Sequence, residues 1–397
     1  MISANKKYRY TWRPGCKFTA QVDGPQFFPA MLDAIRAANN FICLEMYLME
    51  SGWVADQFIN ALLQARRRDV SVFVLLDDYG SHGLTHNDRK RLESVGIQLQ
   101  FFNPLRWRRL YASLQRDHRK LLLIDGDLAF VGGSGITDDF QHPDRPAQNW
   151  HEIMVMIEGP VVQDWQDLFS RAWLNTRGQP CNLPVVIAAP RTEDQLGRVS
   201  IAEGRGHQEI NRSLIKRCRN AERRIWISTP YFIVSRKLRH TLRRMAHSGL
   251  DVRIMVPGPI SDHPWVRHAS RGYYTRLLRQ GVRIFEYQPR FLHAKLQLCD
   301  NWVSIGSSNL DRWNQRWNLD ANQEVDDPHF VTTVAVLFEE DLRHCHEIRF
   351  KDWQIRPVRQ RMREWFWGRG VHLLGLIVRL LQRRRSINKP ERKSHDT

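Results

Sequence analysis

The same polar pattern occurs twice in this chain, as Asp117-His118-Arg119-Lys120-Leu121-Leu122-Leu123-Ile124-Asp125 and as Leu292-His293-Ala294-Lys295-Leu296-Gln297-Leu298-Cys299-Asp300. Each copy has His, any residue, Lys, four residues and Asp, and the apolar run after the Lys predicts a strand. On a strand, His and Lys two positions apart face the same side, so both can reach one ligand. One copy would be a weak signal, but two copies in matched surroundings favour a functional site.

The elements around the two copies also repeat. We expect a helix end and a short strand at 37–47 and 220–231, amphipathic helices at 55–68 and 235–248, buried strands at 70–76 and 252–257, and further strands at 96–99 and 281–285. This order predicts βαβ units with parallel strands, and therefore an α/β chain built from two copies of one unit. The Gly/Pro-rich, weakly periodic residues 177–206 are the expected junction. The predicted domains are 1–180 and 200–345, followed by a tail at 351–397.

The composition restricts the partner and the compartment. The 397 residues carry a formal charge of +18, which favours a nucleic acid, an anionic membrane surface or a phosphate-bearing substrate. Six cysteines without a C-x-x-C pair argue against a zinc ribbon or a disulfide framework and favour a reducing compartment. The first 17 residues lack the apolar region of a secretory signal, and no uncharged apolar run reaches the ~18 residues that span a bilayer. We therefore expect any membrane contact to be peripheral.

The excess of positive charge is concentrated at the C-terminus. Residues 351–397 contain 13 Lys and Arg but only 4 Asp and Glu, together with Trp353, the aromatic run 365–367 and the apolar run 373–378. Cations interleaved with aromatic and apolar residues fit an interfacial helix on anionic lipid. The alternative is a helix that packs on the body and ends in a solvated basic tail. A second basic and aromatic stretch, 101–111, is a membrane-facing loop or an ordinary surface loop.

The duplicated motif, with Gly306-Ser307-Ser308-Asn309 downstream of the second copy, resembles the phospholipase D superfamily over nearly all of the chain up to about residue 340. Residues 45–47, 157–160, 229–232 and 306–311 are similar to bacterial cardiolipin synthases. The basic tail and the lack of N-terminal membrane helices look most like the short B branch of that family. The resemblance implies two α/β/α sandwich domains about a pseudo-twofold axis, with one active site between them. It also implies a peripheral protein at the cytoplasmic face of the bacterial inner membrane.

The resemblance also implies the site residues. The catalytic motif residues are His118, Lys120, Asp125, His293, Lys295 and Asp300, and the supporting residues are Glu152, Asp320, Ser307, Asn309, Gly133 and Ser134. Gly135 stands where the family has Asn, and Asp320 stands where it has Glu. Asp125 and Asp300 follow their Lys by five residues, ~16 Å along a strand, which favours a structural role. Glu45 and Tyr47 are expected to contact a headgroup or, alternatively, to form a buried hydrogen-bonded pair.

These residue types fit phosphodiester chemistry without a metal or another cofactor. One imidazole attacks phosphorus to give a phosphohistidine, and the other protonates the leaving alkoxide and later deprotonates the incoming alcohol. The two Lys and the small-residue loop stabilise charge on the phosphoryl oxygens. Glu152 and Asp320 are the expected acids that fix the tautomers of the histidines.

The acceptor of the phosphoryl group decides the activity. Water would make the protein a lipase, whereas the hydroxyl of a second phosphatidylglycerol would give cardiolipin and glycerol. We favour the second reaction, with phosphatidylglycerol and an anionic membrane surface as partners and no nucleic-acid partner. The alternatives are a nuclease of the same superfamily, because +18 also suits a nucleic acid backbone, and a non-enzymatic membrane scaffold.

Overall fold

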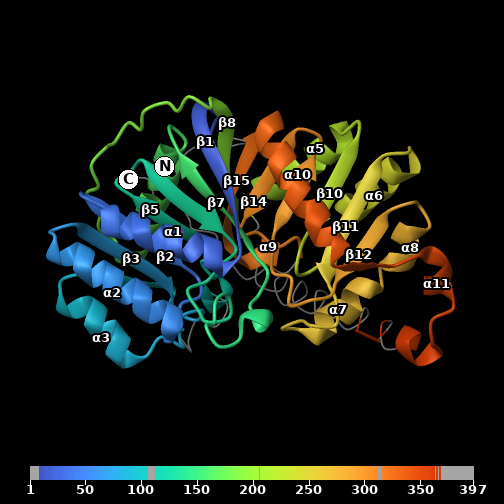
Figure 1. Cartoon of the computed structure of the whole chain (residues 1–397), viewed down its shortest axis with the longest axis horizontal. Coiled ribbons are helices and arrows are strands. Elements are labelled where there is room, and N and C mark those ends of the chain that lie inside the picture. The colour runs from blue at the N-terminus through green and yellow to red at the C-terminus, as the bar shows by residue number, and fades with distance from the viewer. Residues whose placement is uncertain are drawn as a thin grey trace, which may run out of the picture.

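The computed structural model describes residues 9–105, 112–204, 206–311, 314–362, 364, 366 and 367. One mixed sheet runs through the molecule (Figure 1). The strands of its first half are β1 (Arg13–Val22), β2 (Phe41–Met46), β3 (Ser71–Asp77), β4 (Gln98–Phe102), β5 (Lys120–Ile124), β6 (Leu128–Gly132) and β7 (Ile153–Glu158). Those of the second half are β8 (Gln195–Glu203), β10 (Arg224–Ser228), β11 (Asp251–Pro257), β12 (Arg283–Tyr287), β13 (Leu296–Cys299), β14 (Trp302–Gly306) and β15 (Leu319–Asp326).

The two halves have the same strand order. From the outer edge inward it is β4-β3-β2-β5-β6-β7-β1 in the first half and β12-β11-β10-β13-β14-β15-β8 in the second. β1 and β8 pair antiparallel where the halves meet, so the halves are related by a pseudo-twofold axis between these strands. The short strands β9 (His207–Gln208) and β16 (Cys345–Glu347) pair with β8 and β12. The predicted duplication of one α/β unit is confirmed.

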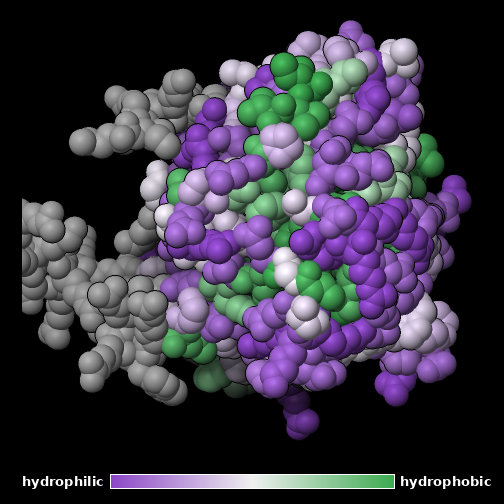
Figure 2. Space-filling model, turned by 90° about the vertical axis from the view of Figure 1, so that its left-hand side faces the viewer, coloured by the Kyte–Doolittle hydropathy of each residue, from purple (hydrophilic) through white to green (hydrophobic). Residues whose placement is uncertain are grey.

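Helices cover both faces of each half. The helices are α1 (Gly24–Ala37), α2 (Trp53–Arg67), α3 (His86–Ser94), α4 (Val162–Arg177), α5 (Glu209–Asn220), α6 (Arg236–His247), α7 (Pro264–Arg271), α8 (Tyr274–Leu278), α9 (Asn314–Trp317), α10 (Pro328–Arg343) and α11 (Phe350–Gln354). Apolar residues of α1, α2 and α3 pack on one face of the first half, and those of α5, α6 and α8 pack on one face of the second. The surface over the first half is mainly hydrophilic, with smaller hydrophobic patches (Figure 2), as expected for helices whose apolar sides face a sheet.

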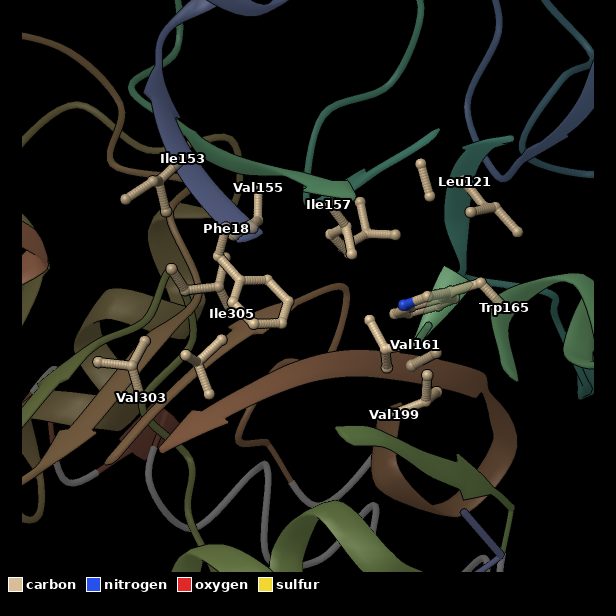
Figure 3. Packing of buried hydrophobic residues seen from close by; sticks show 14 of the residues in the cluster. Phe18, Leu121, Ile153, Val155, Ile157, Val161, Trp165, Val199, Val303 and Ile305 are labelled. Carbon is tan, nitrogen blue, oxygen red and sulfur yellow. The ribbon is translucent and has the colours of Figure 1, made fainter. Parts of the chain in front are cut away.

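A shared core joins the halves. Phe18 of β1 and three residues of β7 lie near Val303 and Ile305 of β14 (Figure 3). Phe18 also packs on Phe330 of α10, with ring centroids 5.8 Å apart. Trp165 of α4 donates its indole N–H to Gln323 of β15 at 2.9 Å. Because α4 contacts the second half and α10 contacts the first, the halves are held together by buried packing rather than by a linker alone.

The expectation of an irregular junction over 177–206 is wrong for its last part. Strand β8 lies within this range and pairs with both β15 and β1 at the centre of the sheet. Its apolar residues Val199 and Ile201 enter the shared core. The alternate positions of the strand hold polar residues that are also buried, Ser200 and Arg198, and Arg198 pairs with Glu324 at 2.6 Å. The sequence pattern was weak because this strand buries ion pairs on one face.

The start of the expected C-terminal tail packs on the body. Trp353 of α11 is 3% exposed, and its ring centroid lies 5.2 Å from that of Tyr274 in α8. The apolar run 373–378 lies outside the described residues. Within the described residues, none of the helices has both the length and the apolar character that spanning a bilayer requires.

The two motif aspartates hold turns at the ends of the strands far from their Lys. Asp125 accepts the backbone N–H groups of Asn39, Asn40 and Phe41 at 2.8 Å each. Asp300 accepts the equivalent N–H groups of residues 222–224 at 2.8–3.0 Å. Both aspartates have positive φ, 52° and 51°. These contacts give both residues a structural role.

We predict that Asp125→Asn lowers the free energy of unfolding by about 1–3 kcal/mol, because an amide cannot replace a carboxylate that accepts three N–H groups. Asn tolerates positive φ, so the change isolates the loss of the carboxylate. Urea unfolding measures the effect, and Asp69→Asn is the control, because Asp69 also has a positive φ, 65°, and its side chain is 99% exposed. Loss of activity in Asp125→Asn without loss of stability would instead assign Asp125 to the chemistry.

Candidate active site

The two His/Lys pairs lie where their strands begin. His118 and Lys120 stand at the start of β5, and His293 and Lys295 stand just before β13. All four side chains are buried, with residue exposures of 9%, 4%, 9% and 0%. Each Lys Nζ donates to the carbonyl oxygen of its own His, at 2.7 Å in the first half and 2.6 Å in the second. Each pair is therefore a fixed unit.

Backbone hydrogen bonds join each motif to the other half. The N–H of His118 donates to Leu319, at the start of β15, at 2.9 Å, and Leu319 donates back to Arg116 at 2.9 Å. In the matched position, His293 donates to His151, next to β7, and His151 donates to Phe291, both at 2.8 Å. These bridges place His118 beside residue 320 and His293 beside residue 152, each in the opposite half.

Those following residues are the two predicted acids. Nδ1 of His118 lies 2.9 Å from Oδ1 of Asp320, and Nδ1 of His293 lies 2.6 Å from Oε2 of Glu152. Both carboxylates are fully buried. An acid on Nδ1 holds the imidazole in one tautomer and leaves Nε2 for chemistry. The expected histidine–acid contacts are present, and each acid serves the histidine of the other half.

The site concentrates positive charge in a buried place. Burial lowers the pKa of His118 and Lys120, and the Lys neighbours lower both further, that of Lys120 to about 7. Burial and the same Lys side chains lower the pKa of His293 well below its usual value, and burial lowers that of Lys295. The positive charge of Lys295 lowers the pKa of His118, and that of Lys120 lowers the pKa of His293. The two pairs therefore lie in one site. An anion bound there would relieve this repulsion.

The two histidine–acid pairs use acids of different length, and the residue that faces each acid differs in size to match. In the second half the short Asp320 accepts a hydrogen bond from Ser307 at 2.8 Å. In the first half Gly133 occupies the matched position, and a Cβ there would lie 2.1 Å from Oε2 of Glu152. The longer carboxylate thus fills the space that the serine side chain fills in the other half. This explains the departure of Asp320 from the family pattern together with Gly133.

The other expected supporting residues surround this pair of contacts. Ser134 is buried and donates to the carbonyl oxygen of Gly135 at 2.9 Å, so its hydroxyl is tied to the loop. Asn309 is 1% exposed, and its Oδ1 has no hydrogen-bond partner in the described structure. It is a buried acceptor beside the Ser307 loop.

Glu45 and Tyr47 have different surroundings. Glu45 is 1% exposed and pairs with Arg119 at 3.1 Å, so its side-chain partner is Arg119 and not the Tyr47 of the expected buried pair. The ring of Tyr47 lies 4.8 Å from that of His118, and Nζ of Lys120 lies 5.0 Å from its centroid. Tyr47 therefore forms a wall of the site.

Aromatic side chains enclose His293 as well. The ring centroids of Trp150, Phe140 and Phe291 lie 5.2, 5.5 and 5.8 Å from that of His293. Such walls reduce the access of water to the reacting atoms. The basic and aromatic stretch 101–111, expected to be a membrane-facing or an ordinary surface loop, falls partly outside the described residues, since 106–111 are not described.

One supporting network was not predicted. His151 lies between Asp23 and Asp341, with each imidazole nitrogen 3.0 Å from a carboxylate oxygen. Asp23 also accepts the N–H of Glu152 at 3.0 Å and pairs with Arg290. Burial lowers the pKa of His151, but the two carboxylates outweigh burial and raise it to about 9. The only sequence signal was a polar His next to Glu152 at the start of a buried strand.

A second unpredicted residue, Asp77, supports the other motif. It follows the buried strand β3 and accepts the N–H of Asp117 at 2.8 Å and a hydrogen bond from Arg116 at 3.2 Å. Burial raises the pKa of Asp77 to about 6. An acid at the carboxyl end of a predicted parallel strand is the signal that could have identified it. Among the described residues, no group of three or more His, Cys, Asp and Glu is arranged to hold a metal ion.

We predict that Gly133→Ala lowers activity by about 10–100-fold, because the new methyl group displaces Glu152 and with it His293. The double variant Gly133→Ser/Glu152→Asp copies the second half and should recover activity over Gly133→Ala. Initial rates on dispersed phospholipid measure both.

Gly206→Ala is the control for this pair, because an added Cβ there meets nothing within 4 Å. Equal rates for Gly133→Ala and Gly206→Ala would contradict the close fit between Gly133 and Glu152.

We predict that His151 stabilises the fold in a pH-dependent way. Its folded pKa of about 9 lies above the unfolded value of about 6.5, so its contribution is complete below pH 6.5 and is lost as pH rises through 9. Urea unfolding of His151→Gln should show a stability deficit relative to wild type that is larger at pH 7 than at pH 10, by about 1–3 kcal/mol. His86→Gln, at an exposed position, is the control. An equal deficit at both pH values would mean that His151 is neutral.

Comparisons with known proteins agree with this site. The sequence model of the family described as "Cardiolipin synthase, PLD-like domain" matches residues 31–173 and 214–342. The chain is 32% identical over 348 residues to a cardiolipin synthase of Halalkalibacterium halodurans, covering 86% of this chain and 69% of that protein. It is 32% identical over 336 residues to cardiolipin synthase A of Pseudomonas entomophila, covering 83% and 69%. These relatives do not distinguish the expected B branch.

Solved structures show the same fold. The phosphatidylserine synthase of Haemophilus influenzae superposes with a TM-score of 0.70 at 13% identity, over 91% of this chain and 94% of that one. Polyphosphate kinase from Porphyromonas gingivalis gives a TM-score of 0.54 at 14% identity, over 82% and 50%. The repeated family match and the similarity to cardiolipin synthases over most of the sequence lead to one conclusion: the chain belongs to the cardiolipin synthase family of phospholipase D-like proteins.

Proposed function

We propose that this protein transfers a phosphatidyl group from one phosphatidylglycerol to another, giving cardiolipin and glycerol through a phosphohistidine. The observation that carries the proposal is the single buried site in which two His/Lys pairs meet and each imidazole is held by a carboxylate. The relatives named cardiolipin synthases support this reaction over the nuclease alternative.

The charge of the site suits a phosphodiester anion. Lys120 and Lys295 repel each other in a buried place, and this repulsion falls when a phosphate bearing one negative charge lies between them. The same negative charge favours protonation of one imidazole. Substrate binding would thus prepare the general acid that the first step requires.

The reaction then follows from the two imidazoles. Nε2 of one histidine attacks phosphorus, a P–N bond forms, and the P–O bond to glycerol breaks as the other imidazolium gives its proton to the leaving oxygen. The hydroxyl of the second phosphatidylglycerol next gives its proton to the now neutral imidazole and attacks phosphorus. The P–N bond breaks, and both histidines return to their starting states. Lys120 and Lys295 stabilise the phosphoryl oxygens in both steps.

The walls of the site favour transfer over hydrolysis. Tyr47 lies against His118, and Trp150, Phe140 and Phe291 lie against His293. A phosphohistidine in such surroundings meets a lipid hydroxyl more readily than bulk water. We also propose that the protein works as a peripheral protein on the cytoplasmic face of the cell membrane, where its positive charge meets anionic lipid.

The pure protein incubated with phosphatidylglycerol vesicles and EDTA should give cardiolipin and glycerol in equal amounts. Chromatographic separation of the lipids and an enzymatic glycerol assay measure the two products. Phosphatidic acid with glycerol would instead identify a lipase, and hydrolysis of DNA or RNA without lipid turnover would identify a nuclease. Loss of turnover in EDTA that one added metal restores would contradict the metal-free mechanism.

His118→Ala and His293→Ala should each lower turnover by about 10³-fold or more, because each removes one of the two required imidazoles. Thermal melting verifies that the variants fold, and His86→Ala is the surface control. Near-normal turnover in either variant would rule out one shared site.

A further inference from the structure

The described residues between 358 and 367, which do not include 363 and 365, turn apolar side chains to solvent and a charged one to the body. Residues 358–362, 364, 366 and 367 are helical, and Val358, Met362 and Phe366 recur every fourth position. These three side chains, the apolar stripe, are 66%, 66% and 63% exposed. Helices on soluble proteins turn their apolar residues toward the core, so this arrangement needs an explanation.

Among the described residues of this segment, the buried side chain is a charged one that is firmly attached. Glu364 is 2% exposed and accepts hydrogen bonds from Arg271 of α7 and Arg356, both at 3.0 Å, and from Gln360 at 3.2 Å. Arg271 is held in turn by Glu286 of β12 at 2.6 Å. The buried ion pairs therefore fix the rotation of the segment about its own axis. The apolar stripe is held outward by this anchor.

The segment is continuous with the rim of the active site. Trp367 lies 6.4 Å from Trp265 at the start of α7, and Trp265 lies 6.0 Å from His263, measured between ring centroids. His263 stacks on Tyr231, whose hydroxyl donates to Asp262. Tyr231 follows Ser228, the last residue of β10, and Ser228 pairs with Leu296, the residue after Lys295, so this loop borders the site. The negative charge of Asp262 also opposes the lowering of the pKa of His293 and Lys295. In Figure 1, α7 and the segment after α11 lie along the same lower edge of the molecule.

Other exposed side chains near the stripe suit an anionic lipid surface. Trp265 and Ile260 on the rim are 43% and 50% exposed. Arg359 and Arg361 lie exposed in the segment, and residues 355–362 contain no Asp or Glu. Apolar side chains flanked by Trp and Arg are the composition of a surface that enters the headgroup region of a bilayer.

We propose that Val358, Met362 and Phe366, with Trp265 and Trp367 beside them, form the surface that docks on an anionic bilayer and sets it against the rim of the active site. The inference rests on the proposed function in one respect: lipid substrates reach the site from a bilayer. It places the contact on a segment fixed by Glu364. The tail after residue 367, residues 363 and 365 and the loop 106–111 lie outside the described residues.

The test compares two triple variants of the full chain with equal added charge. The docking variant is Val358→Glu/Met362→Glu/Phe366→Glu. The control is Val185→Glu/Ile187→Glu/Val336→Glu, which alters three apolar side chains that are 89%, 83% and 61% exposed elsewhere. Flotation with phosphatidylglycerol vesicles should fall by about tenfold or more in the docking variant and stay near wild type in the control. Equal flotation of the two variants would overturn the proposal.

Activity separates docking from damage to the site. The activity of the docking variant should be about tenfold below that of wild type on vesicles. On detergent-dispersed phosphatidylglycerol it should stay within about twofold of wild type. Equal losses on both substrates would mean that the stripe serves the fold, and would also overturn the proposal. If wild type makes no cardiolipin on either substrate while the flotation difference stands, the proposed function fails and the docking surface does not.

A fluorescent label tests what covers the stripe. Met362→Cys carrying an environment-sensitive dye should shift its emission to the blue only when phosphatidylglycerol vesicles are added. A blue-shifted emission in the lipid-free protein would mean that another part of the chain or a second copy covers the stripe. Light scattering would then separate a monomer from a dimer, and either result would overturn bilayer docking.

Discussion

The backbone bridges between the halves are the constraint on which the site depends. They pair the residues before β5 with the start of β15, and the residues before β13 with the start of β7. Because these bridges fix the register, His118 meets Asp320 and His293 meets Glu152. Neither half holds a complete histidine–acid pair. The shared core of α4, α10 and the central strands keeps the halves in the position that the bridges require.

This arrangement places like charges together at an electrostatic cost. Burial and mutual repulsion lower the pKa of both histidines and of Lys120. Burial also lowers the pKa of Lys295. The fully buried carboxylates offset part of that cost. A phosphodiester would offset more, so the charge of the site suits an anion. Preorganised charge of this kind acts on the transition state without further rearrangement.

The two half-sites differ although the fold is duplicated. One uses Glu152 with Gly133, and the other uses Asp320 with Ser307. His151, which is held by Asp23 and Asp341, directly precedes Glu152. The matched position before Asp320 holds Leu319, so Asp320 has no equivalent histidine directly before it. Two imidazoles that perform different steps have no need of identical surroundings. This difference in surroundings is a physical reason for one histidine to attack phosphorus while the other transfers protons.

The duplication, the α/β class and the two His/Lys pairs could be predicted from the sequence, because spacing along a strand and order along the chain are local properties. The sequence also pointed to Glu152 and Asp320 as acids and to turns at Asp125 and Asp300. Three features became visible only in the folded chain: each acid contacts the histidine of the other half, β8 is a central strand, and Glu45 is buried against Arg119. The tertiary structure alone brought in Asp23 and Asp77, and it alone turned the apolar side of the 358–367 segment outward. These features depend on contacts between residues far apart in the chain, which no local pattern encodes.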